Sequence, residues 1–149
     1  MKWIDVPPVW LLGFIVLTYW IRAFQPDALS LGGTIGWGIG TMLVAVGLIL
    51  ILLAALQMQR HRTTIIPHQE AARLVTTGIF GRSRNPIYLG DALIFSGLAL
   101  RWEVPIALGL VPVFTWIITQ RFIIAEEQRL MAKFPAEFTR YRETTPRWV

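Results

Sequence analysis

Four long apolar runs constrain the fold of this 149-residue chain more than any other feature of its sequence. At 1.5 Å per residue, a helix over the first, second or fourth run is long enough to cross a hydrocarbon core of roughly 30 Å, the first only barely. The third run is shorter, and its length is also compatible with a re-entrant or shallow helix. The runs cover about residues 8–24, 31–56, 87–100 and 104–124. They predict an all-α fold, a polytopic helical bundle in a membrane.

The composition agrees with a membrane protein. Hydrophobic residues make up 54% of the chain and charged residues 15%, whereas soluble domains usually contain about 25% charged residues. In a soluble protein, the net charge of +5 would suggest nucleic-acid binding. Here the lysines and arginines lie between the apolar runs, so they indicate membrane topology, and we expect no nucleic-acid partner.

The distribution of basic residues favours four transmembrane spans. Arginine and lysine concentrate in the segment 57–86 and in the tail, residues 125–149, whereas the other two connections contain one arginine between them. Four spans place both basic segments on one side of the membrane, which is the cytoplasmic side by the positive-inside rule. Three spans would separate them. We therefore expect one domain over residues 1–149, a short cytoplasmic helical tail and both termini in the cytoplasm.

Several chemistries lack the residues that they need. The chain contains no cysteine, which excludes disulfides, thiolate catalysis and cysteine metal sites. With only His61 and His68 as histidines, we expect no dedicated metal centre. The sequence also contains no recognisable nucleophile–histidine–acid set and no phosphate-binding glycine loop.

Gly32, Gly36 and Gly40 are spaced four residues apart at the start of the second run. This spacing lines one helix face with small residues and is typical of close helix contact in membranes. The contact partner is either another helix of the same chain, which is the simpler interpretation, or a second copy. A homo-oligomer therefore stays open.

The tail predicts two short helices. The first covers residues 126–133 and continues out of the fourth run, and Pro135 ends it and can begin a second helix over 136–142. An apolar stripe follows both helices and consists of Leu130, Phe134, Phe138 and Tyr141. The stripe lies either on the membrane surface or against the end of the bundle.

Polar residues gather where the third run begins and where the fourth run ends. They are Arg84, Asn85, Tyr88, Asp91, Arg121, Glu126 and Glu127. Arg84 and Tyr88 are four residues apart, and Tyr88 and Asp91 three, so each pair shares one helix face. Asp91 lies about one turn inside the run, where an acid indicates function unless it pairs with an arginine at the interface. The glutamates have a structural alternative, because Glu126 and Arg129 are spaced for an ion pair.

Three segments, in order along the chain, resemble one known family. RTTIIP and RLVTTGIF, within residues 62–80, resemble the segment that bacterial members carry before their motif. RNPIYLG, residues 84–90, resembles R-(H/N)-P-x-Y-x-G, and EEQRLMAKFPAEFTRYRETTPRW, residues 126–148, resembles E-E-x-x-L-x-x-x-F-G-x-x-Y-x-x-Y. The family is that of the isoprenylcysteine carboxyl methyltransferases and the related phospholipid N-methyltransferases. The first two runs match it only as hydrophobic helices.

The resemblance implies an integral-membrane enzyme, at the inner membrane of a bacterium, that uses S-adenosylmethionine to methylate a lipophilic or lipid substrate. The implied cofactor-binding residues are Arg84, Asn85, Tyr88, Gly90, Glu126 and Glu127. Either glutamate can hold the ammonium group or the ribose hydroxyls of the cofactor. Tyr88 can stack or form a hydrogen bond, and free backbone groups near Asn85 can bind adenine. Gly90 permits close helix approach.

The methyl acceptor decides between two catalytic candidates. A carboxylate acceptor needs only a cation to hold it, and Arg121 is the candidate because the family has an arginine shortly before its glutamate pair. An amine acceptor must lose a proton, which makes Asp91 the candidate as a base or ammonium partner. An isoprenylcysteine carboxyl methyltransferase-like activity is the first choice. The alternatives are a phosphatidylethanolamine-type N-methyltransferase and, from another class, a non-enzymatic membrane scaffold.

The chain departs from the family pattern at three positions. Asn85 stands where the best-known members have histidine, so a role that needs the imidazole is absent. Pro135 replaces the usual glycine after the phenylalanine. Phe138 replaces the first tyrosine of the tail, whereas Tyr141 keeps the second.

Overall fold

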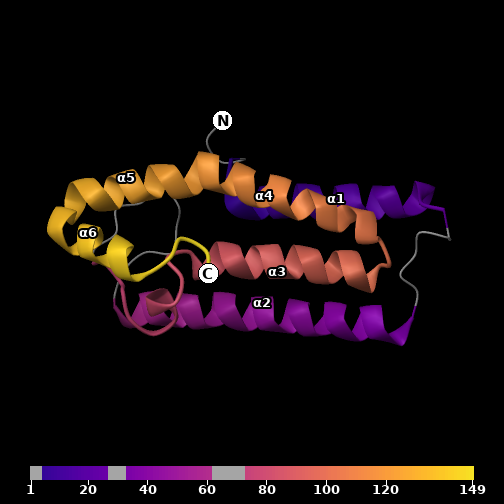
Figure 1. Cartoon of the computed structure of the whole chain (residues 1–149), viewed down its shortest axis with the longest axis horizontal. Helices are drawn as coiled ribbons and strands as arrows, with labels where there is room; N and C mark the ends of the chain where they lie inside the picture. The colour runs from indigo at the N-terminus through magenta and orange to yellow at the C-terminus, as the bar shows by residue number, and fades with distance from the viewer. Residues whose placement is uncertain (1–4, 27–32, 62–72) are drawn as a thin grey trace.

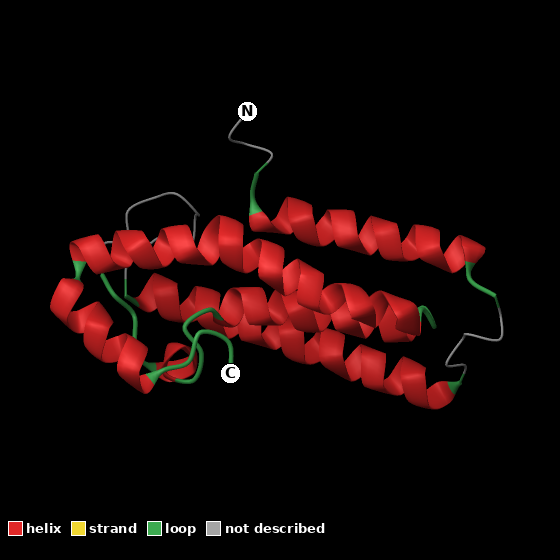
Figure 2. Cartoon of the chain, turned by 45° about the horizontal axis from the view of Figure 1, so that its top comes forward, coloured by secondary structure: helices red, strands yellow, loops and turns green. Residues whose placement is uncertain are grey.

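A computed structural model describes residues 5–26, 33–61 and 73–149, and all regular elements within them are helical (Figure 2). The prediction of an all-α fold is therefore confirmed. The α-helices are α1 (Pro7–Phe24), α2 (Thr34–Arg60), α3 (Pro86–Arg101), α4 (Val111–Ile118), α5 (Ile124–Lys133) and α6 (Pro135–Thr144). Short 3-10 segments cover Gly78–Gly81 and Pro105–Leu110, and a π-helical turn covers Thr119–Ile123.

Helix α3 is the central element of the bundle. It lies between α2 and α4 in Figure 1 and contacts α1, α2 and α4. Half of its 16 residues are buried, including the polar Asp91. The end of α2, the start of α3, and helices α5 and α6 meet at one end of the bundle (Figure 1).

Within the described residues, three helical segments are long and apolar enough to cross a membrane. They are Pro7–Phe24, Thr34–Arg60 and the continuous run Pro105–Lys133. They overlap the first, second and fourth apolar runs of the sequence and indicate an integral membrane protein. Helix α3 spans about 24 Å at 1.5 Å per residue, so it does not reach across a typical hydrocarbon core on its own.

Backbone contacts between glycines bring α2 and α3 together. A Cβ atom added to Gly97 would lie 2.6 Å from the carbonyl oxygen of Gly40, and one added to Gly90 would lie 2.7 Å from that of Gly47. Such short distances leave no room for a side chain, so the two backbones touch. Of the three glycines noted in the sequence, Gly40 therefore packs within the chain, while Gly32 lies outside the described residues.

Aromatic rings join α3 to the helices on its other side. Phe14 of α1, Phe95 of α3 and Phe114 of α4 pack with ring centroids 5.4 to 5.8 Å apart. Phe95 and Phe114 are completely buried. Rings of this size contribute much of the apolar area that a bundle buries, so this cluster fixes α3 between α1 and α4.

The tail helices fold back against the bundle. Helix α5 continues the fourth apolar run, Pro135 begins α6, and the predicted break between the two helices is confirmed. Phe138 and Tyr141 are buried, and the Tyr141 hydroxyl donates a 2.6 Å hydrogen bond to the carbonyl oxygen of Phe80. This half of the apolar stripe packs against the end of the bundle.

The glycine contact makes a prediction for Gly47→Ala. The new Cβ atom would lie 2.6 Å from the carbonyl oxygen of Gly90, so α2 and α3 must separate. Overpacking of this kind typically costs about 1–3 kcal/mol. We expect a lower midpoint of thermal unfolding in detergent. Gly38→Ala, in the same helix with nothing within 4 Å of its added Cβ, should leave the midpoint unchanged. Equal midpoints for the two variants would contradict this packing.

Candidate functional site

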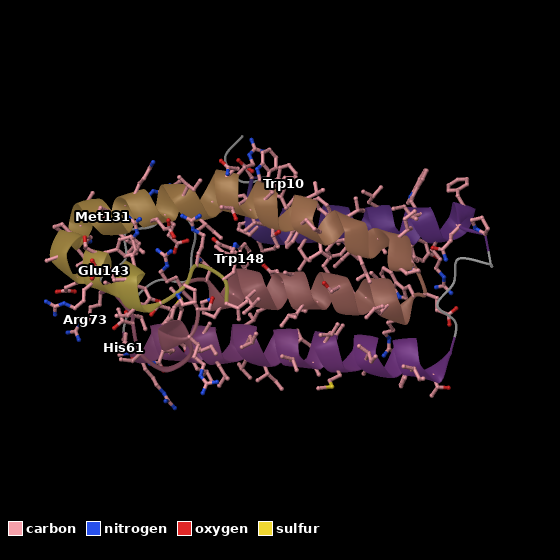
Figure 3. All side chains as sticks on the ribbon, in the orientation of Figure 1. Trp10, His61, Arg73, Met131, Glu143 and Trp148 are labelled. Atoms are coloured by element: carbon pink, nitrogen blue, oxygen red, sulfur yellow. The ribbon has the colours of Figure 1, made fainter. Side chains whose placement is uncertain are left out.

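Three segments that are distant in the sequence converge at the tail end of the bundle. They are the residues just before α3, the start of α5, and the C-terminal strap, which we define as residues 145–149. The strap leaves α6 and returns to the start of α3 (Figure 1). Trp148 of the strap packs against the core cluster that joins α1, α3 and α4 (Figure 3).

Glu127 is held between two arginines. Arg147 of the strap binds it through both ends of the carboxylate, with Nε 3.0 Å from Oε1 and Nη2 2.7 Å from Oε2. Nη1 of Arg84 lies 3.1 Å from the same Oε1 atom. The side chains of Arg84 and Glu127 are only 11% and 15% exposed, so water screens this cluster little.

Arg84 keeps unused hydrogen-bond donors inside the cluster. Its Nε and Nη1 atoms are buried without a hydrogen-bond acceptor, because the ion pair with Glu127 is not aligned as a hydrogen bond. Burial lowers the pKa of the Arg84 guanidinium, and the charge of Glu127 offsets this only in part. The hydrogen bonds to Glu127 instead raise the pKa of Arg147.

The residues before α3 hold the strap in place. The backbone N–H of Arg84 donates a 3.0 Å hydrogen bond to the carbonyl oxygen of Pro146. The Asn85 side-chain amide donates a 2.9 Å bond to the carbonyl oxygen of Arg147, and the backbone N–H of Asn85 bonds to the Ser83 hydroxyl. Asn85 therefore binds the strap with its side chain, and its backbone N–H is already occupied.

The two glutamates have different partners. The buried Tyr88 donates a 3.4 Å hydrogen bond to Oε2 of Glu126, while Glu127 binds the two arginines. Gly90 lies two residues after Tyr88 on α3 and touches α2 instead of the glutamates. The structure thus brings Arg84, Glu126 and Glu127 to one end of the bundle, together with the first turn of α3.

Asp91 is a buried carboxylate without a partner among the described residues. It is 7% exposed and lies one turn after Tyr88 on the same helix face. Among the described residues, no ion pair joins it to a lysine or an arginine. The described part of the chain thus offers no interfacial arginine pair for this acid.

Arg121 lies apart from the glutamate cluster. It belongs to the π-helical turn between α4 and α5, and its side chain is half exposed. Its guanidinium stacks over the Trp10 ring at 5.2 Å, and Nη1 lies 3.6 Å from Oδ1 of Asp5. The described contacts of Arg121 therefore lead toward α1, and none joins it to Glu126, Glu127 or Asp91.

Sequence reasoning missed Arg147 and the strap. The segment 126–148 that resembles the family contains Arg147, but the motif quoted for the family ends at Tyr141. A further signal is a tryptophan next to an arginine at the end of an otherwise polar tail. A polar tail usually leaves its residues in solvent, whereas Thr145 and Trp148 are withdrawn into the structure.

Within the described residues, no group of three or more histidine, aspartate or glutamate side chains could hold a metal ion.

Comparison with known proteins places the chain in a family. Residues 36–137 match the family model described as phospholipid methyltransferase, a range that includes α2 except for its first two residues, and all of α3, α4 and α5. No curated protein and no solved structure is significantly similar to the chain. The match covers about two thirds of the sequence and both Arg84 and Glu127, whereas the strap follows it. The chain is a membrane methyltransferase and belongs to the phospholipid methyltransferase family.

Proposed function

We propose that the protein transfers a methyl group from S-adenosylmethionine to a lipophilic amine, a membrane lipid or lipid-like molecule, at the cytoplasmic membrane surface. The observation that carries the choice of acceptor is the buried Asp91 carboxylate, which has no partner in the described structure. A buried acid without a partner is costly, and a cationic substrate would supply the missing charge.

The site fits the amino-acid end of the cofactor, which carries an ammonium and a carboxylate. Glu127 can hold the ammonium, and the buried, unused donors of Arg84 can bind the carboxylate. Glu126 and Tyr88 are placed to bind ribose hydroxyls, and the first turn of α3, from Asn85 to Gly90, would line the adenosine. When bound, the cofactor supplies a methyl group already activated by its sulfonium.

The enzyme then has three tasks, which are to align donor and acceptor, to exclude water and to deprotonate the amine. Asp91 would take the proton from the substrate ammonium, which would leave the nitrogen lone pair free for methylation. The bound cofactor would supply the activated methyl group and keep the electrons of its carbon–sulfur bond. General-base assistance of this kind typically contributes 10²–10⁴-fold to the rate.

A carboxylate acceptor, as in the isoprenylcysteine enzymes, is the second candidate. It would need a cation near the reacting oxygen, and the sequence offered Arg121. The contacts of Arg121 with Asp5 and Trp10 lead away from the glutamate cluster, which favours the amine. A non-enzymatic scaffold does not agree with membership of a methyltransferase family.

We further propose that residues 1–149 form one domain with four spans, in which α3 is a short third span enclosed by the others. The end of α2, the start of α3 and both tail helices lie at one end of the bundle, as an even number of crossings requires (Figure 1). The basic segment 57–86 and the tail 125–149 would then face the cytoplasm, with both termini, at a bacterial inner membrane.

Glu127→Gln tests the cofactor site. The change removes the charge that would hold the ammonium, and a hydrogen bond to a charged group is worth about 1.5–3 kcal/mol. We expect at least roughly tenfold weaker binding of S-adenosylhomocysteine, the demethylated product, by calorimetry on detergent-purified protein. Glu137→Gln, which removes an exposed carboxylate on α6, should bind normally. Unchanged affinity in a folded Glu127→Gln protein would refute this assignment.

Asp91→Asn tests the acceptor. The amide cannot take a proton, so turnover of an amine lipid such as phosphatidylethanolamine should fall by about 10²–10⁴-fold while product affinity is retained. Ser96→Ala, which removes a hydroxyl bonded only to its own helix, serves as the control. Methyl incorporation from labelled cofactor measures the rate. Full amine turnover in Asp91→Asn, or transfer by the parent protein to prenylcysteine carboxylates alone, would exclude the proposed acceptor.

A further inference from the structure

The cluster around Glu127 has more positive than negative charge. Two guanidinium groups share one carboxylate, which leaves one positive charge in excess among side chains that are 11%, 15% and 38% exposed. An uncompensated charge beside the largely buried Arg84 and Glu127 is unfavourable, because little water reaches these two side chains. The cluster is therefore complementary to an anion.

The guanidinium groups of Arg84 and Arg147 also have more hydrogen-bond donors than they use within the cluster. A guanidinium group offers five N–H donors. Arg147 uses Nε and Nη2 on Glu127, and Arg84 has Nε and Nη1 buried without an acceptor. Two partly unused guanidinium groups that contact one carboxylate match a ligand that carries its own carboxylate, since arginine binds carboxylates through pairs of parallel N–H donors.

Arg147 reaches this cluster because the strap is anchored on both sides of it. Two hydrogen bonds from Arg84 and Asn85 hold the carbonyl oxygens of Pro146 and Arg147, and Trp148 packs against the helix core. The anchors fix the backbone of Arg147 relative to the start of α3. A side chain held in this way needs little further ordering when it binds a ligand.

We propose that Arg147 of the strap and Arg84 together bind the carboxylate at the amino-acid end of the cofactor, beside the ammonium site at Glu127. This inference rests on the proposed function and adds a binding residue that lies outside the matched family range. The strap is then a wall of the cofactor site. The phosphate of a lipid headgroup has the same anionic chemistry, so the test must separate these two sources.

A pair of ligands that differ only in the carboxylate provides the test. S-adenosylhomocysteine and its decarboxylated analogue share the adenosine, the thioether and the amine. By calorimetry, the parent protein should bind S-adenosylhomocysteine at least about tenfold more tightly than the analogue. In Arg147→Gln this preference should disappear through weaker binding of S-adenosylhomocysteine, with the analogue unaffected. Arg140→Gln, which removes an exposed tail charge, should keep the full preference.

The possible outcomes separate this inference from the proposed function. If the folded parent protein binds neither ligand, the cofactor site itself is refuted. If it binds both and Arg147→Gln keeps the preference, or if both ligands lose affinity equally, the carboxylate assignment is overturned while the cofactor site stands. A preserved preference combined with a raised KM for the phospholipid would assign the anion site to the lipid phosphate.

A second measurement needs no change at Arg147. The chain has no cysteine, so Val149→Cys, at the exposed end of the strap, can carry a single spin label. Binding of S-adenosylhomocysteine should reduce the mobility of the label in the electron paramagnetic resonance spectrum, and the decarboxylated analogue should not. Increased mobility on binding would mean that the ligand displaces the strap, and it would overturn the proposal even if Arg147→Gln did not fold.

Discussion

The shared carboxylate of Glu127 is the interaction on which the tail end of this molecule depends. It links α5, the residues before α3 and the C-terminal strap. Breaking a buried ion cluster by removing one partner is far more costly than breaking an exposed pair, because the remaining charges stay desolvated. The same costly arrangement leaves unused donors and excess positive charge, the two properties that a site for a zwitterionic ligand requires.

This cluster can form only because α3 sits deep in the bundle. The glycine contacts with α2 on one side, and the phenylalanine cluster with α1 and α4 on the other, allow a short helix to be buried between longer ones. Burial in turn places Tyr88 and Asp91 beside protein and not lipid. In our account, the water-soluble cofactor and the lipid-borne acceptor meet at the N-terminal end of α3. The Arg-Asn-Pro sequence at this end supplies the polar groups that a site for a water-soluble ligand needs.

Much of this architecture can be predicted from the sequence. The apolar runs locate the long helices, because helix length and bilayer thickness are physically matched. Pro135 locates the break between α5 and α6, because proline cannot continue a hydrogen-bonded helix. The Arg84 and Glu127 neighbourhood followed from motifs that resemble one family. Each of these features is encoded within a single stretch of sequence, so it can be predicted from that stretch without knowledge of contacts elsewhere in the chain.

The missed features depend on contacts between distant segments. Gly47 and Gly97 become significant only when the opposing helix and its register are known. The π-helical turn Thr119–Ile123 adds a residue to one turn, so the direction of Arg121 does not follow from 3.6-residue spacing. Arg147 lies in a short non-helical segment without periodicity, and its role depends on hydrogen bonds to residues more than sixty positions away.

The most direct test of the central claim is an experimental structure of the protein in a lipid nanodisc with S-adenosylhomocysteine bound. Our account predicts that the amino-acid end of the ligand lies at the Glu127 cluster, with its carboxylate between Arg84 and Arg147 and its amine against Glu127. It also predicts that the strap stays on the start of α3. Ligand density at another end of the bundle, or a cluster unchanged beside a ligand bound elsewhere, would contradict it.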